Sequence, residues 1–136
     1  MEKNYVLFYQ IFIDAKNKEI KEIVYNDEQT LSQLYPMFGS KCRGMEGISY
    51  VNQWDLVIGD EEAYYNDYDY GFYLEGFGYI HGSGILMGAD DNGETASTFF
   101  GVSKMEELVR FATEEEVAKQ LDWFNNNGGI QVVSWC

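Results

Sequence analysis

The sequence predicts an α+β fold, with one domain over residues 1–136. We expect a mostly antiparallel β-sheet with about three short helices packed on one face. Two observations support this. The length of 136 residues is that of one ordinary domain. The predicted elements follow one another in the order ββα, then a β-rich middle, then ααβ, which favours an antiparallel sheet covered by helices over alternating βαβ units.

The first third predicts a β-hairpin followed by a short helix. Residues 5–13 are apolar at nearly every position and rich in aromatic and β-branched side chains, as in a central strand buried on both faces. After a polar turn at residues 14–18, residues 19–25 read as the second strand, although their apolar spacing also suits a helix. Asn26 is a plausible helix cap, and Pro36 should end or kink that helix near Leu34. The apolar positions of the helix are Leu31, Leu34, Tyr35 and Phe38.

The middle of the chain predicts a loop at residues 38–47 and then several short strands. The alternating residues 54–58 read as a strand, and an acidic, tyrosine-rich loop follows at 59–69. Residues 70–80 have β character interrupted by glycines, which mark bends or bulges. Two further strands are expected at 85–87 and 95–102, joined through Asn92-Gly93, a strong hairpin signal.

The last third predicts two helices and a closing strand. Ser103 with Glu106, and Thr113 with Glu116, have the spacing of capping boxes. We expect the helix stripes to contain Met105, Leu108, Val109 and Ala112 in the first helix and Val117, Leu121 and Phe124 in the second. Residues 125–129 should end the second helix, and residues 130–135 read as a strand.

The formal charge of −14 is concentrated in one part of the chain. Residues 44–103 hold 11 of the 23 acids and no Lys or Arg. Direct nucleic-acid binding is disfavoured, because neutralising phosphates needs basic side chains. The span indicates a surface for a basic partner, since charge of one sign steers association with the opposite sign. The alternative is an acidic surface that only keeps the protein soluble.

The densest candidate site is residues 60–70, which hold five acids and four tyrosines. If Asp67 and Asp69 are extended, they share a face at a spacing of roughly 6.7 Å. Such a row could present carboxylates where a DNA-binding protein expects phosphates, and tyrosines would add contact area. The alternative is a solvated loop whose tyrosines pack beneath it. The predicted partner-binding residues are Asp55, Asp60, Glu61, Glu62, Tyr64, Tyr65, Asp67, Tyr68, Asp69, Tyr70 and Glu75.

The other polar clusters bear on metal binding and catalysis. Asp90, Asp91 and Glu94 could offer oxygen ligands to a hard cation, but they lack the EF-hand spacing, and a hairpin turn is favoured. His81 is the only histidine, so a zinc site is disfavoured, and nothing assigns it to catalysis. We expect no cofactor. Cys42 and Cys136 are expected to be free thiols in a cytoplasmic protein of a bacterial or phage-infected host cell, with no membrane segment.

In composition alone the chain is similar to small phage-encoded inhibitors of bacterial defence nucleases and to nuclease immunity proteins. The similarity carries over no individual residue. It implies a non-enzymatic inhibitor, of anti-CRISPR, antirestriction, nucleic-acid-mimic or immunity type, whose surface from residues 44–103 covers the basic site of a nuclease or toxin. The alternatives are a small carboxylate-dependent enzyme or carbohydrate-binding domain, and a self-associating structural protein.

Overall fold

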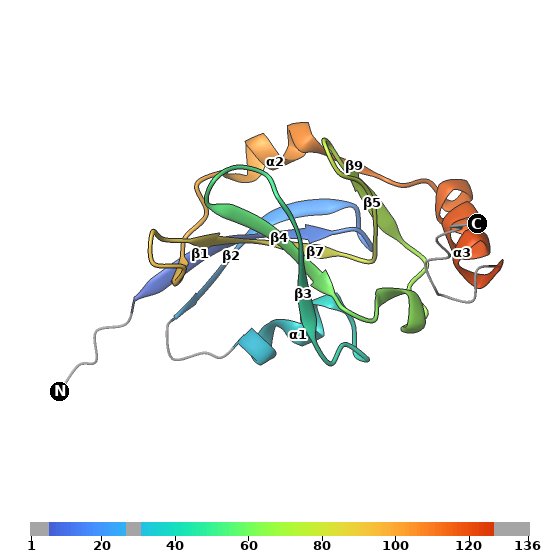
Figure 1. Cartoon of the computed structure of the whole chain (residues 1–136), viewed down its shortest axis with the longest axis horizontal. Helices are drawn as coiled ribbons and strands as arrows, with labels where there is room; N and C mark the ends of the chain where they lie inside the picture. Colours follow the sequence, from blue (N-terminus) through green and yellow to red (C-terminus); the bar gives the residue numbers. More distant parts are fainter. Residues whose placement is uncertain (1–5, 27–30, 127–136) are drawn as a thin grey trace, which may run out of the picture.

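The computed structural model describes residues 6–26 and 31–126 and has the predicted α+β fold (Figure 1). All strand pairs in this part of the chain are antiparallel. The strands are β1 (Leu7–Asp14), β2 (Glu19–Asn26), β3 (Met45–Tyr50), β4 (Asp55–Asp60), β5 (Gly71–Leu74), β6 (Gly78–His81), β7 (Gly84–Ala89), β8 (Thr95–Ala96) and β9 (Val109–Phe111). The helices are α1 (Tyr35–Phe38), α2 (Val102–Leu108) and α3 (Glu114–Asn126), with 3₁₀ turns η1 (Leu31–Leu34) and η2 (Ala63–Tyr65).

The larger sheet has the strand order β2-β1-β7-β4-β3, with β8 continuing on the β1 side of β7. The predicted hairpin of β1 and β2 and the predicted interior place of β1 are both confirmed. Gln10 is fully buried where β1 gives way to β8. Its side chain donates to the carbonyl of Ala96 and accepts from the amide of Gly88, so it joins three strands.

A smaller sheet of order β6-β5-β9 covers one face of the larger sheet together with α2. Phe72 and Leu74 of β5 and Met105 of α2 pack there on Ile11 and Val57. The predicted helix stripe through Ala112 is therefore only partly right. The helix α2 ends at Leu108, and the β-branched and aromatic residues that follow pair as β9 with β5.

The opposite face of the larger sheet is covered by α1. Leu34 and Phe38 pack there against Phe12, Ile58 and Ile85. The prediction that the helices share one face is consequently wrong, because α1 and α2 contribute to two separate cores; Figure 1 shows them on opposite sides of the sheet. Helix α3 lies at one end of the molecule, beyond the smaller sheet.

Several predicted boundaries also differ from the structure. The predicted break near Leu34 is present, because the 3₁₀ turn η1 ends at Leu34; Pro36 lies just after it in the first turn of α1, where proline's missing N–H costs no hydrogen bond. Asn26 is the last residue of β2, and residues 27–30, where the predicted helix would begin, lie outside the described residues. Strand β3 replaces the end of the predicted 38–47 loop, and its register shifts between Gly47 and Ser49. Of the strand expected at 95–102, only β8 forms.

The two capping-box sequences have different outcomes. Thr113 and Glu116 form the predicted reciprocal pair, in which each side chain accepts a hydrogen bond from the other residue's amide, at 3.2 Å and 3.0 Å. Ser103 is not a cap, since α2 begins at Val102 after Gly101 and has no side-chain cap bond. The strand predicted at residues 130–135, together with most of the predicted helix end at 125–129, lies outside the described residues.

Candidate functional site

The base-free span of residues 44–103 does not form one face. Pairing of β4 with β7 places Asp55 opposite Gly88 and Gly59 opposite Gly84. Acids that follow β4 therefore lie at one end of this strand pair, whereas the acidic turn that follows β7 lies at the other (Figure 1). Separation along the sheet divides the predicted surface into two acidic regions.

Asp55 is excluded from partner contact because its exposed fraction is 0%. Its carboxylate accepts hydrogen bonds from the amides of Phe99 and Phe100 at 2.9 Å and 2.8 Å, and from the side chain of Asn52. The residue therefore holds the segment between β8 and α2 against β4. A structural role replaces the predicted binding role.

Asp60 and Tyr68 are corrected in the same way. Asp60 is 4% exposed, and its Oδ2 accepts from the Tyr68 hydroxyl at 2.6 Å and from Asn66 at 2.7 Å. Its Oδ1 accepts from the amide of Glu62. Burial and this hydrogen bond raise the pKa of Tyr68, so the phenol keeps its proton. Asp60 thus organises the 60–68 loop from inside.

The predicted row of Asp67 and Asp69 is not extended. Asp67 has a φ of 59°, in the left-handed region, which aspartate tolerates better than most residues. Its carboxylate pairs with Lys41 at 2.9 Å, and a hollow next to it is lined by Lys16, Lys41 and both aspartates. Bases from the N-terminal third thus flank this part of the acidic loop, and the phosphate-like spacing is lost.

An acidic–aromatic hollow of about 520 Å³ lies beside this loop. It is bordered by β3, the end of β4, η2, the turn from β5 to β6, β6 itself and α3. Of the predicted residues it brings together Asp60, Glu61, Tyr64 and Tyr65. The described residues that line it are Glu46, Ile48, Asp60, Glu61, Ala63, Tyr64, Tyr65, Phe77, Tyr79, Ile80, His81 and Phe124; they include three carboxylates and no Lys or Arg.

Three rings are stacked along one wall of the hollow. Tyr64 lies between His81 and Phe124, with ring centroids 4.6 Å and 4.5 Å away and nearly parallel planes. Tyr65 meets the edge of Phe124 at 5.2 Å. Both faces of Tyr64 are covered, so this predicted contact residue supports the wall. Tyr65, 63% exposed, and Phe77, 50% exposed, remain open to a partner.

His81 is held as a neutral ring. Its Nε2 lies 2.8 Å from the carbonyl oxygen of Tyr68, which only accepts, so Nε2 carries the proton. Its Nδ1 then accepts from the Tyr79 hydroxyl at 2.7 Å. Burial lowers the pKa of His81 and raises that of Tyr79. The pair therefore contributes neither a positive nor a negative charge to the hollow.

Sequence reasoning missed eight of these twelve lining residues. Tyr79 and His81 alternate along β6, and strand alternation was the signal that could have grouped them on one face. Glu46 and Phe124 come from segments distant in sequence, and no local pattern connects them to the loop. Tyr70 packs on the core and donates to the carbonyl of Phe38, which removes it from the contact set.

Glu46 carries the clearest electrostatic signal of the hollow. Partial burial raises its pKa, and the nearby negative charges of Glu61 and Asp60 raise it further. The same acids, with burial as the larger cause, raise the pKa of the neighbouring Cys42 thiol to about 11. Among the described residues, the charged groups that shift the pKa of Glu46 and Cys42 are all acidic. Cys42 is a free thiol, and Cys136 lies outside the described residues.

The remaining predicted residues lie away from the hollow or accept hydrogen bonds from backbone amides. Glu75 lies in the turn from β5 to β6, on a different hollow with Glu107 and Arg110. Asp90 Oδ1 accepts hydrogen bonds from the amides of Asn92 and Glu94, which confirms the hairpin turn. These bonds engage an oxygen that is a candidate ligand for a cation. In residues 6–26 and 31–126, no three His, Cys, Asp or Glu side chains are grouped to hold a metal ion.

Comparison of the chain with protein-family models, curated proteins and solved structures gives no match. None of the helices in the described part of the chain is long and apolar enough to cross a membrane.

Proposed function

We propose that the protein is a non-enzymatic binding protein that inhibits a basic, nucleic-acid-binding partner such as a nuclease or toxin. The acidic–aromatic hollow and its rim form the contact surface. The observation that carries the proposal is the lining: carboxylates from two strands converge there with exposed aromatic rings, and none of the described lining residues is basic. Phage anti-defence and immunity roles both fit this chemistry.

Charge and shape support different parts of the proposal. The exposed carboxylates of Glu46, Glu61 and Glu62 would steer a basic surface toward this end of the molecule. Tyr65 and Phe77 offer apolar area that a partner can bury at the centre of the contact. A rim of charge around aromatic anchors is the usual composition of a specific protein interface.

Capture of partners from bacterial lysate by the immobilised protein tests the proposal. We expect nucleic-acid-binding proteins to be retained at low salt, released by competing DNA, and less retained by the charge-reversed variant Glu61→Lys with Glu62→Lys. Purified partner should lose nuclease or DNA-binding activity when the wild-type protein is added. Reversal of two charges at the contact should weaken capture by about tenfold or more.

The matched control is Glu106→Lys with Glu107→Lys, which makes the same charge change at exposed positions of α2. This variant should capture the partner nearly as well as the wild type. Equal loss in both variants would mean that only net charge matters. If the variant Glu61→Lys with Glu62→Lys captures the partner as well as the wild type does, the proposed surface is refuted.

A second candidate function has one specific observation in its favour. Glu46, whose pKa is raised, lies beside Glu61 in a hollow with aromatic walls, as an acid and a carboxylate do in glycoside-cleaving sites. Asp60 cannot join such a pair, because three donors occupy its carboxylate. Saturable binding or hydrolysis of an oligosaccharide, lost in Glu46→Gln, would favour this candidate over the inhibitor.

A further inference from the structure

The acidic–aromatic hollow has a composition suited to one cationic side chain. Its volume of about 520 Å³ falls within the range of small-ligand sites. Two of its carboxylates belong to Glu46 and Glu61, which are exposed to solvent and can therefore contact a bound side chain. The third, Asp60, is saturated by internal donors and adds only its negative field.

The mouth of the hollow provides aromatic faces for a planar cation. Tyr64 is enclosed by its two neighbours, but Tyr65 and Phe77 project into solvent. A guanidinium stacks on such rings while its N–H groups bond a carboxylate, whereas a lysine ammonium offers no planar face. The neutral His81–Tyr79 pair leaves no positive charge in the lining to repel a cation.

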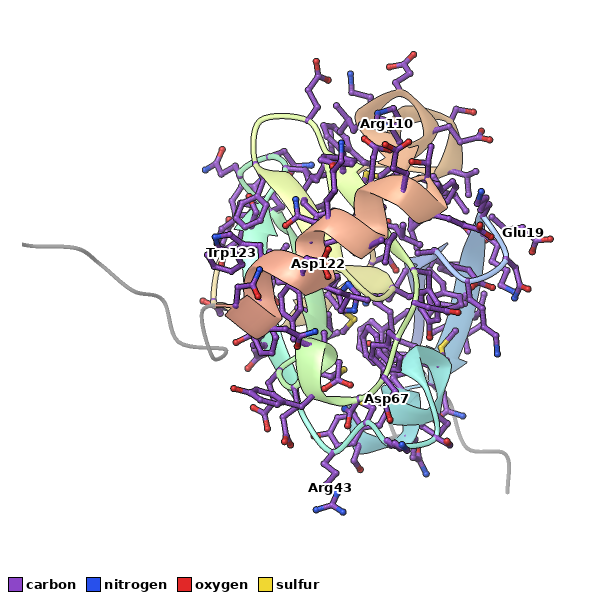
Figure 2. The ribbon with its side chains drawn as sticks, turned by 90° about the vertical axis from the view of Figure 1, so that its right-hand side faces the viewer. Glu19, Arg43, Asp67, Arg110, Asp122 and Trp123 are labelled. Atoms are coloured by element: carbon purple, nitrogen blue, oxygen red, sulfur yellow. The ribbon has the colours of Figure 1, made fainter. Side chains whose placement is uncertain are left out.

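The same chain already uses this chemistry internally. The guanidinium of Arg110 lies 4.3 Å from the ring centroid of Tyr73 and makes two 2.9 Å hydrogen bonds to the carboxylate of Glu116. Figure 2 shows Arg110 above α3, with Asp67 and the outward-pointing Arg43 below it. Arg110 is committed to Glu116, and Lys41 to Asp67, so neither of these bases neutralises the hollow.

We infer that the acidic–aromatic hollow receives a single arginine side chain from the basic partner, with the guanidinium between Glu46 and Glu61 and against the rings at the mouth. The inference rests on the proposed function for the source of the arginine. It goes further by naming the residue type and the anchor position. Relief of the mutual repulsion among the hollow's carboxylates would favour the bound state.

Titration of the full chain with N-acetyl-arginine amide, followed by NMR of the aromatic side chains, tests the inference without the partner. We expect saturable shifts of the Tyr65, Phe77 and Phe124 ring signals. N-acetyl-citrulline amide has nearly the same shape without the charge, and it should bind about tenfold more weakly because the ion-pair and cation–π terms are lost. The comparison uses wild-type protein, so it does not depend on any variant folding.

The variant Glu46→Gln with Glu61→Gln should weaken arginine binding by a similar factor, and Tyr65→Leu should weaken it independently. The control Glu106→Gln with Glu107→Gln removes the same charge on α2 and should bind the probe like the wild type. Equal binding of arginine and citrulline probes, or no saturable binding, would overturn the inference. So would ring shifts caused by a neutral oligosaccharide or by protein concentration alone, which would assign the hollow to a sugar or to a second copy.

The arginine titration and the partner-capture assay test the two proposals separately. Arginine binding without capture of any basic partner would refute the proposed function and keep the cation site of the hollow. Capture that survives in the Glu46 and Glu61 variant, together with absent arginine binding, would keep the acidic surface and refute the anchor.

Discussion

At the residue scale, His81 shows how a buried side chain sets a pH dependence. Burial lowers its folded pKa below the ordinary value of 6.5, although the Tyr68 carbonyl and Asp69 act in the opposite direction. Between the folded and unfolded pKa values, the unfolded chain therefore binds more protons. The stability that His81 contributes is fully present above about pH 6.5 and is lost as the pH falls through the folded pKa.

The prediction concerns the difference between wild type and His81→Gln, measured by urea unfolding from pH 8 down to about pH 5. The wild type should lose stability relative to the variant below about pH 6.5, with a slope no steeper than about 1.4 kcal/mol per pH unit, the limit for one proton. The subtraction removes the shared effect of protonating surface acids. A difference that is flat, or that grows as the pH falls, would contradict the neutral tautomer.

Residue identity alone could not separate the carboxylates that build the protein from those that face a partner. Asp55, Asp60 and Glu61 look alike in the sequence, yet two are buried under backbone and side-chain donors and the third is exposed. The two backbone donors to the Asp55 carboxylate come from residues 44 and 45 positions further along the chain. Such long-range bonds leave no local pattern.

At the element scale, α3 holds one wall of the hollow through Phe124, and its start is the Thr113–Glu116 capping box. Thr113→Ala removes the side-chain acceptor for the Glu116 amide, and it should lower stability by about 1 kcal/mol. Hydrogen exchange should quicken first in α3, and the ring signal of Phe124 should broaden. Thermal unfolding and hydrogen exchange measure both effects.

Ser103→Ala is the matched control for this prediction. Its sequence context resembles a capping box equally well, but Ser103 lies inside α2 and makes no cap bond. We expect a change within about 0.5 kcal/mol, as for other exposed surface positions. Similar losses in both variants would mean that the effect of Thr113→Ala does not come from the lost cap hydrogen bond.

Elements with long apolar patterns were the most predictable, and some of the shortest ones were missed. The β1–β2 hairpin and α3 follow directly from apolar runs and caps. Strand β9 has only three residues after a helix, and β3 carries a register shift, so neither displays a full period. The hollow is lined mainly by short elements such as β3, η2 and β6, which explains why only part of its lining could be predicted.

At the scale of the whole molecule, the base-free span of the sequence does not become a base-free surface. Lys41 reaches Asp67, while the acids around Glu46 and those of the β7–β8 turn lie at opposite ends of the sheet. Five basic residues are engaged in ion pairs in the described part of the chain: Lys21, Lys41, Lys104, Arg110 and Lys119. Burial and then the negative charges of Glu61 and Asp60 raise the pKa of Glu46, so repulsion between acids is present at the hollow.

The resulting prediction is that salt stabilises the fold. Raising ionic strength from about 0.01 M to about 0.15 M shortens the Debye length from about 30 Å to about 8 Å and screens the repulsion between acids. The melting temperature should rise by a few °C, the shift expected for about 1 kcal/mol in a domain of this size. A fall on adding salt would show that the ion pairs outweigh the repulsion.

Two variants locate this repulsion. Glu46→Gln with Glu61→Gln removes two charges at the hollow, and Asp91→Asn with Glu94→Gln removes two at the exposed β7–β8 turn. At low salt the first variant should raise the melting temperature more than the second, because burial and the negative charges of Glu61 and Asp60 act on the Glu46 carboxylate. The two should converge as salt is added. Equal effects at low salt would mean that the negative charge is spread evenly and that the hollow holds no stored repulsion for a cationic partner to relieve.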